Sequence, residues 1–142
     1  MEKKIFITAI FVLSCTFFSC KKQEQDQVPL TGVNIYITIA EPAYAKLNAV
    51  TGWVYIAGGV RGIIVYRASS SSFMAYDRDC PYQPNNTCAL VQVDSSNNFE
   101  AFDACCGSKF LITDGSVING PATAPLKQYE TTFDGATLHI FN

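Results

Sequence analysis

Apolar and polar residues alternate with a period of two along most of the chain after residue 32, and this pattern limits the possible folds more than any other feature. The cleanest example is Val33–Ile39 (VNIYITI). Successive side chains of a β-strand point to opposite faces of a sheet, whereas a helical face repeats every 3.6 residues. Similar β-branched or aromatic runs follow at Trp53–Ile56, Gly62–Tyr66, Phe73–Tyr76, Ala89–Val93, Phe99–Phe102, Lys109–Ile112 and Leu138–Phe141. Short strands at roughly ten-residue spacing predict an all-β sandwich or barrel.

Turn-forming residues separate these runs. They are Gly58-Gly59, Ser69–Ser72, Ser95–Asn98, Asp114-Gly115 and Asp134-Gly135. An Asp-Gly pair between apolar runs favours a hairpin, because it tolerates a positive φ. Only Pro42–Val50 is expected to be helical, and that segment is short. With 49% hydrophobic and 15% charged residues, the chain has the composition of a folded domain rather than a disordered one.

The first 20 residues have the pattern of a bacterial export signal. Two lysines precede the apolar stretch Ile5–Phe18, which is too short to cross a bilayer as a helix of about 20 residues. A small residue followed by cysteine ends this region, and the ending resembles the lipobox of bacterial lipoproteins, whose cysteine is acylated and becomes the new N-terminus. Cys15 and Cys20 both fit. We favour Cys20, because cleavage at Cys15 would leave two phenylalanines exposed on the mature chain.

We therefore expect residues 1–19 to be a lipoprotein signal peptide, residues 20–31 a lipidated flexible tether, and residues 32–142 one domain. The tether prediction rests on Gln23–Pro29 (QEQDQVP), which is polar and has no hydrophobic period. The stretch after Cys20, KKQE, resembles the surface-export signals of lipoproteins from Bacteroidetes-like bacteria. The expected location is the bacterial cell envelope, at the outer membrane on its periplasmic side or at the cell surface, with the lipid as the link to the membrane.

Charge and motif content exclude several classes of function. The chain has 10 Lys+Arg against 12 Asp+Glu, so it has no basic surplus that would bind nucleic acid. Its single histidine, His139, excludes a metal site with two histidines. No nucleophile-elbow, phosphate-binding or metalloprotease motif is present, and we expect no enzyme. Six carboxylates beside predicted turns are expected to cap backbone amides: Asp77, Asp79, Asp94, Glu100, Asp114 and Asp134. Arg61 lies in a turn, and the sequence suggests no partner for it.

Four cysteines follow Cys20, namely Cys80, Cys88, Cys105 and Cys106. An exported chain meets an oxidising compartment, so an even number of cysteines predicts two disulfides. Four cysteines allow three pairings. The pairing of Cys105 with Cys106 ranks last because it closes a strained ring of eight atoms. Either remaining scheme joins the segment 80–88 to the 105–106 pair twice.

The residues around these cysteines resemble the two cluster-binding loops of the Rieske iron–sulfur proteins. The resemblance rests on CPY at residues 80–82 and CCGSKF at 105–110, and it continues through DGSV at 114–117, GPA at 120–122 and PLKQY at 125–129. It extends to DG at 134–135 and LHI at 138–140. It covers residues 33–142 and implies a fold of three small stacked antiparallel sheets, with two loops projecting to form the site.

The Rieske resemblance also implies where the cluster ligands would lie. The family uses Cys-x-His in the first loop and Cys-x-x-His in the second, so that two thiolates bind one iron and two imidazoles the other. Here Cys80 matches the first cysteine, but Tyr82 stands at the first histidine position. Asp103 stands at the second cysteine position and Cys106 at the second histidine position. One ligand of four remains, so we expect no [2Fe–2S] cofactor and no metal. His139 is expected on a sheet face or the surface, far from this site.

The family further implies a disulfide between the two loops, and Cys88 and Cys105 occupy its positions. That pairing leaves Cys80 and Cys106 facing each other, and a second disulfide between them is expected. Tyr82 is expected to fill the volume of the missing imidazole, and Asp103 to cap a loop.

The sequence is compatible with several functions. The leading hypothesis is a lipid-anchored, cluster-free Rieske-fold protein, held by disulfides and acting as a binding or structural module with an unidentified protein partner. The alternative is an electron-transfer protein with an atypical [2Fe–2S] centre that uses the cysteines with Asp103 or Tyr82. Thiol–disulfide exchange by Cys80 and Cys106 and a zinc site of four cysteines are weaker, because neither has its usual ligand or motif spacing.

Overall fold

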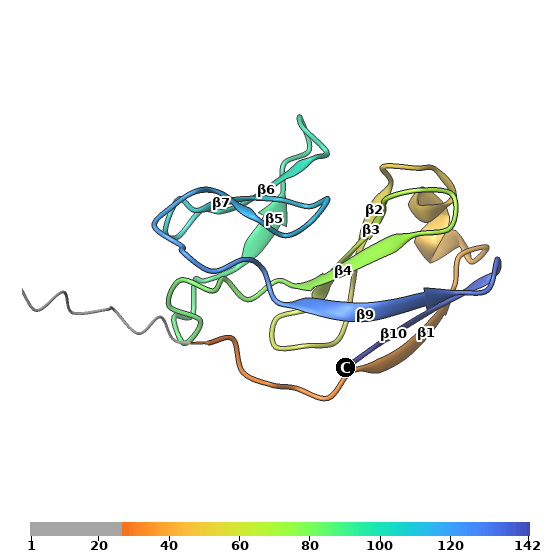
Figure 1. The fold of residues 1–142 in the computed structure, drawn as a ribbon, viewed down its shortest axis with the longest axis horizontal. Helices are drawn as coiled ribbons and strands as arrows, with labels where there is room; N and C mark the ends of the chain where they lie inside the picture. The colour runs from red at the N-terminus through yellow and green to blue at the C-terminus, as the bar shows by residue number, and fades with distance from the viewer. Residues whose placement is uncertain (1–26) are drawn as a thin grey trace, which may run out of the picture.

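The structure is a computed structural model that describes residues 27–142. These residues form an almost all-β protein with two antiparallel sheets (Figure 1). The larger sheet has the strand order β1-β10-β9-β4-β3-β2, and the smaller sheet has the order β5-β6-β7-β8. The strands are β1 (Asn34–Thr38), β2 (Trp53–Ile56), β3 (Ile63–Arg67), β4 (Phe73–Asp77), β5 (Val91–Val93), β6 (Glu100–Asp103), β7 (Lys109–Leu111), β8 (Val117–Asn119), β9 (Gln128–Phe133) and β10 (Thr137–Phe141).

Strand β3 explains how one sheet can support two cores. Ile63 and Val65 belong to one buried cluster, whereas Ile64 and Tyr66 belong to the other. Because successive side chains of a strand point to opposite faces, the continuous apolar run IIVY matches a strand that is covered on both sides. The neighbouring strand β4 divides its side chains between the two clusters in the same way.

The first cluster, which we call the base core, is enclosed by the larger sheet. All six strands of the larger sheet contribute residues to this core, so the sheet curves around it. Each large apolar side chain buried here stabilises the fold by about 1.5–3 kcal/mol. Its buried members are Val33, Ile37, Ile39, Leu47, Val54, Ile63, Val65, Phe73, Ala75, Tyr129, Leu138 and Ile140.

The second cluster, which we call the loop-side core, lies between the two sheets. Ile64, Tyr66 and Tyr76 of the larger sheet contact apolar residues of the smaller one and of the loops next to it. The remaining buried members are Cys80, Ala89, Val91, Val93, Ala101, Phe110, Ile112, Ala122 and Leu126. The loops that carry the cysteines are therefore anchored to the same core as the strands beside them.

The smaller sheet is an insertion between β4 and β9. These two strands pair directly, through Ala75 with Tyr129 and Tyr76 with Gln128. The backbone N–H of Asp77 then donates to the carbonyl of Lys127 at 2.8 Å. The chain thus leaves the larger sheet after β4 and returns at the same place, as Figure 1 shows for the green and blue segments.

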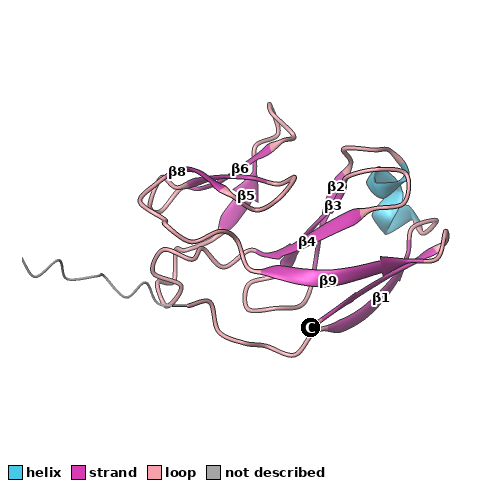
Figure 2. Ribbon diagram, viewed as in Figure 1, coloured by secondary structure: helices cyan, strands magenta, loops and turns pink. Residues whose placement is uncertain are grey.

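The predicted all-β class is confirmed, and eight of the strands were predicted within a few residues of their bounds. The predicted helix Pro42–Val50 is a 3₁₀ helix, η1 (Pro42–Asn48), which lies beside β2 (Figure 2). Strands β8 and β9 were not predicted. The three stacked sheets implied by the family resemblance differ from the observed arrangement, because the β4–β9 pairing joins two of them into one six-stranded sheet.

The predicted signal peptide and Cys20 lie outside the described residues. Of the predicted tether, only residues 27–31 are described, and this part lies against the domain. Val28 is buried, and the carbonyl of Pro29 accepts a hydrogen bond from Lys127 Nζ at 2.8 Å. The carbonyl of Thr31 accepts one from Asn142 Nδ2 at 2.9 Å. Within residues 27–142, no helix has the length and apolar character needed to span a bilayer.

Candidate functional site

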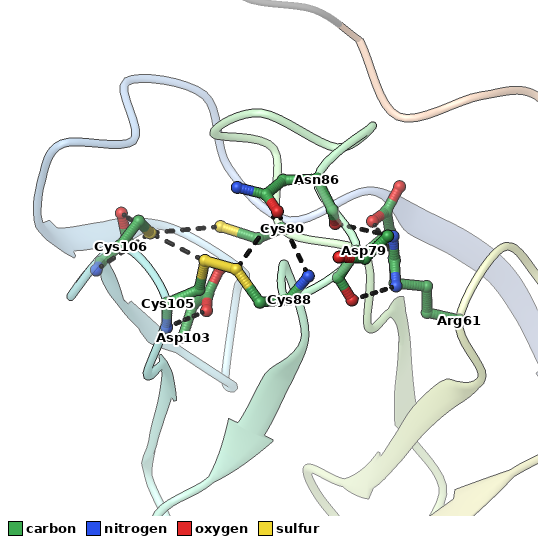
Figure 3. The surroundings of a disulfide bond; sticks show 10 residues. Arg61, Asp79, Cys80, Asn86, Cys88, Asp103, Cys105 and Cys106 are labelled. Carbon is green, nitrogen blue, oxygen red and sulfur yellow. Dashed lines mark hydrogen bonds and ion pairs between the residues drawn. A yellow bond between two sulfur atoms is a disulfide. The ribbon is translucent and has the colours of Figure 1, made fainter.

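Two loops that flank the smaller sheet carry all four described cysteines. The first loop (residues 78–90) joins β4 to β5, and the second loop (residues 104–108) joins β6 to β7. Cys88 and Cys105 form a disulfide that links these loops (Figure 3). The disulfide implied by the family resemblance is therefore present. Both of its cysteines are exposed, so the bond lies on the outside of the loop pair.

Cys80 and Cys106 are free thiols and lie next to this disulfide (Figure 3). Their Sγ atoms lie 3.7 Å apart, which is a contact distance and not a covalent bond. Cys80 is completely buried, whereas Cys106 is half-buried. The second disulfide expected from the sequence is not formed in the structure and stays a prediction.

Asp103 and Ser108 complete the surroundings of Cys106. The carboxylate oxygen Oδ2 of Asp103 accepts a hydrogen bond from Cys106 Sγ at 3.5 Å, and Ser108 Oγ lies 3.0 Å from the same sulfur. Ser108 Oγ also accepts a hydrogen bond from the backbone N–H of Ala122 at 2.9 Å. A third segment of chain, which contains the Gly-Pro-Ala motif, therefore supports the site as well.

The expected loop-capping role of Asp103 is confirmed. Its Oδ1 accepts a hydrogen bond from the backbone N–H of Cys105 at 2.7 Å, which holds the second loop against the end of β6. Asp103 is 1% exposed. One buried carboxylate therefore holds the loop with one oxygen and faces the sulfur atoms with the other.

Burial raises the pKa of the Cys80 thiol well above its ordinary value, and the adjacent Asp103 carboxylate raises it further. A hydrogen bond with the backbone of Tyr82 acts in the opposite direction but is outweighed. Because the thiolate is the reactive form of cysteine, this environment does not favour Cys80 as the attacking group of a thiol–disulfide exchange enzyme.

Arg61 fixes the first loop, and sequence reasoning had given this residue no partner. Its Nε forms an ion pair with Oδ1 of Asp79 at 2.7 Å. Its two terminal nitrogens donate to the backbone carbonyls of Asn86, at 2.7 Å, and Thr87, at 3.0 Å. Burial raises the pKa of Asp79, although the bond to Arg61 opposes that shift. The guanidinium group thus clamps the first loop onto the turn between β2 and β3.

Asp77 holds the base of the same loop. Its buried carboxylate accepts hydrogen bonds from the backbone N–H groups of Val60 at 2.7 Å and Asp79 at 2.8 Å, and from the Tyr129 hydroxyl at 2.6 Å. A weaker bond comes from the backbone of Arg61 at 3.3 Å. Several donors satisfy this charge, so Asp77 acts as a structural anchor between β4, β9 and the glycine turn.

The remaining predicted site residues lie where the sequence indicated. Tyr82 is half-buried and packs against the loop-side core, beside the cysteines. His139 is on β10, where its ring stacks between those of Tyr36, at 4.0 Å, and Phe141, at 4.5 Å. It also lies 2.7 Å from Asn34 Oδ1. All of these partners belong to β1 and β10, so His139 is not part of the cysteine site.

Most of the other carboxylates cap turns as expected. Asp94, Asp114 and Asp134 each accept a backbone N–H from two residues further along the chain. Hydrogen bonds lower the pKa of all three: first from the side chain and then from the backbone of Ser96 or Ser116 for the first two, and from the backbones of Thr137 and Ala136 for Asp134. Asp79 differs, because its main partner is the side chain of Arg61. Glu100 differs as well, because it faces Lys109 at 3.8 Å.

Comparison with known proteins gives one kind of match. No protein-family model and no curated protein matches the sequence. Among solved structures, the chain is similar to the plasma membrane Rieske protein PetC3 of the cyanobacterium Synechocystis PCC 6803, with a TM-score of 0.56 and 23% sequence identity. The match covers 76% of this chain and 99% of the cyanobacterial chain. The paired loops on an inserted small sheet and this structural match lead to the same conclusion: the chain has the Rieske fold.

Proposed function

We propose that the protein is a lipid-anchored domain of the Rieske fold that carries no [2Fe–2S] cluster and acts as a binding or structural module of the bacterial cell envelope. The observation that carries this proposal is the set of side chains at the ligand positions. A Rieske cluster needs two imidazoles. Tyr82 and Cys106 stand at the two histidine positions, and the one histidine of the chain stacks between Tyr36 and Phe141 on another sheet.

The rigidity of the loops supports a role as a recognition surface. The Cys88–Cys105 disulfide, the Arg61 clamp and the Asp103 cap each fix a different part of the loop pair. A surface that is ordered before binding loses less conformational entropy when a partner docks. Bonds within the chain's own residues thus hold the two loops in one arrangement.

A second disulfide between Cys80 and Cys106 belongs to this proposal. The two sulfurs already lie 3.7 Å apart, so a small movement would bring them to bonding distance. Oxidation by a small disulfide such as oxidised glutathione would form one S–S bond here and release two molecules of the reduced thiol. Each interloop bond would stabilise the fold by about 2–4 kcal/mol.

The membrane location rests on two further arguments. The structural neighbour is a plasma membrane protein, which supports a membrane-associated setting for this domain. The lipobox pattern at Cys20 supplies an anchor of the acyl type. We expect Cys20→Ser, but not Cys15→Ser, to move the protein out of the membrane fraction of a bacterial host.

The test of the cluster-free state is anaerobic production of the full chain in iron- and sulfide-replete cells. We expect no visible absorption above the protein bands, and less than about 0.1 iron or sulfide per chain. A matched control restores the family ligands with Tyr82→His, Asp103→Cys and Cys106→His in one chain, which should acquire colour if the loops still accept a cluster. Stoichiometric iron and sulfide in the unaltered protein would overturn the proposal and favour the atypical electron-transfer centre.

A further inference from the structure

Asp103 is a buried carboxylate that forms no ion pair with any residue of the described range 27–142. Buried charges are normally paired with an opposite charge, saturated by hydrogen bonds, or bound to a metal. Asp77 accepts several N–H and O–H donors, and Asp79 has Arg61. Within residues 27–142, neither ion pair involves Asp103, whose Oδ2 faces the thiol of Cys106. On the sulfur side, the contacts of this carboxylate among residues 27–142 are with the thiols of Cys80 and Cys106 and with no cationic side chain.

The donor atoms around that position have the spacing of a tetrahedral metal site. The sulfurs of Cys80 and Cys106 and a carboxylate oxygen of Asp103 all lie within 4.8 Å of one another. In a tetrahedral zinc site, bond lengths near 2.3 Å to sulfur and 2.0 Å to oxygen place two sulfurs about 3.8 Å apart and a sulfur and an oxygen about 3.5 Å apart. The observed distances are 3.7 Å between the sulfurs and 3.5 Å between Cys106 Sγ and Asp103 Oδ2.

We propose that Cys80, Cys106 and Asp103 bind one Zn²⁺ ion when the two cysteines are reduced. Thiolate and carboxylate are both established zinc ligands, and three protein ligands leave a fourth position for solvent. Cys106 is half-buried, so solvent can reach this side of the site. Binding replaces the two thiol protons by the metal and releases them, so that two thiolates and one carboxylate surround the divalent ion.

Other groups around the sulfur atoms fit such a site. The backbone N–H of Ser108 points at Cys106 Sγ at 3.4 Å, and the Ser108 hydroxyl lies 3.0 Å from it. Donors of this kind stabilise a thiolate and orient a metal ligand. Because Cys88 and Cys105 are bonded to each other, their sulfurs are not free to bind the metal ion. Their disulfide also holds the two ligand loops together. Metal binding and a Cys80–Cys106 disulfide exclude each other, so the oxidation state of this pair decides whether the ion binds.

The inference rests on the cluster-free state of the proposed function, and the test separates the two. The full chain carries Cys15→Ser and Cys20→Ser, and a second version adds Cys88→Ser and Cys105→Ser, so that Cys80 and Cys106 are its remaining thiols. Both versions are reduced with a phosphine under anaerobic conditions, titrated with Co²⁺ as a spectroscopic probe, and then with Zn²⁺. We expect one Co²⁺ per chain with thiolate charge-transfer and tetrahedral d–d bands, fully displaced by one equivalent of Zn²⁺.

Variants made in the second version, in which Cys80 and Cys106 are the remaining thiols, identify the ligands. Cys106→Ser and Asp103→Asn should each weaken Zn²⁺ binding at least tenfold, while His139→Ala, the matched control on β10, should leave it unchanged. Circular dichroism verifies that each variant is folded; if Asp103→Asn is not, Cys106→Ser at its half-buried position decides. Absence of stoichiometric Co²⁺ and Zn²⁺ binding, or binding that survives Cys106→Ser, would overturn the inference. Absence of zinc together with absence of iron and sulfide leaves the proposed function intact, whereas iron and sulfide would overturn both.

Discussion

Three buried aspartates show how differently one residue type can be used within a small site. Asp77 accepts several hydrogen-bond donors, Asp79 pairs with an arginine through one carboxylate oxygen, and Asp103 accepts a backbone amide and faces a thiol. Composition and local spacing suggested turn caps for the first two, and could not reveal Arg61 as a partner. The acceptors of Arg61 lie 18 to 26 residues along the chain, and two of them are backbone carbonyls, which carry no sequence signal.

At this scale we predict the effect of Arg61→Met. The substitution removes three hydrogen bonds and leaves Asp79, whose side chain is fully buried, without its counter-charge. The free energy of unfolding should fall by about 2–4 kcal/mol, measured by denaturant titration. The control Lys109→Met breaks a surface pair at 3.8 Å and should change it by less than about 0.5 kcal/mol.

A double-mutant cycle with Asp79→Asn assigns the loss to the buried charge. The combined Arg61→Met and Asp79→Asn chain should lose less stability than the sum of the two single changes, because the neutral amide needs no counter-charge. Strictly additive losses would show that Arg61 acts through its carbonyl contacts alone.

The strands that the sequence predicted are more deeply buried than the two strands that it did not predict. Strand β3, with four fully buried apolar residues in a row, was predicted from its composition. Strand β9 carries one buried residue, Tyr129, among polar neighbours, and two of the three residues of β8 are exposed. These two strands are specified by pairing with β4, β10 and β7 rather than by their own hydrophobic pattern.

The turn between β2 and β3 gives a prediction at the scale of the element. Gly59 has a φ of 61°, and a Cβ atom there would overlap the Asp77 carboxylate and lie 2.7 Å from the Tyr129 hydroxyl. Gly135 also has a positive φ, 103°, but a Cβ there would meet no atom within 4 Å. At either position, an alanine in this backbone conformation should lower the free energy of unfolding by about 1 kcal/mol.

Gly59→Ala should therefore be more destabilising than Gly135→Ala by about 2 kcal/mol or more, because it also displaces the buried carboxylate from its donors. Chemical denaturation of the two variants side by side measures the difference. Equal losses would mean that the Asp77 network tolerates displacement, contrary to the anchoring role described above.

For the molecule as a whole, buried tyrosines link stability to alkaline pH. Burial raises the pKa of Tyr66, Tyr76 and Tyr129 above its ordinary value of 10.0, and the Asp77 carboxylate adds to the shift of Tyr129. The folded state therefore holds these phenol protons more tightly than the unfolded state does. Their contribution to stability is complete below pH 10 and is lost as the pH rises through the higher folded-state pKa values.

We predict that the free energy of unfolding falls steeply between about pH 10 and about pH 12, measured by urea titration at fixed pH values. Tyr129→Phe should lower stability near neutral pH by about 1–2 kcal/mol, since the 2.6 Å bond to Asp77 is lost, and should make the alkaline decline shallower. Tyr36→Phe is the control, because this residue is 64% exposed. It should change neither the stability near neutral pH nor the steepness of the alkaline decline. An unchanged alkaline slope in Tyr129→Phe would contradict the assignment.

The direct pairing of β4 with β9 has a consequence for how such a protein can change over evolutionary time. The segment between Asp77 and Lys127 leaves and rejoins the larger sheet at the β4–β9 pairing. No buried member of the base core comes from this segment. Ligands between these two residues can consequently be exchanged, lost or replaced without a change in the base core. A fold arranged in this way can lose one set of ligands, keep its base core intact, and acquire a different binding site in the same loops.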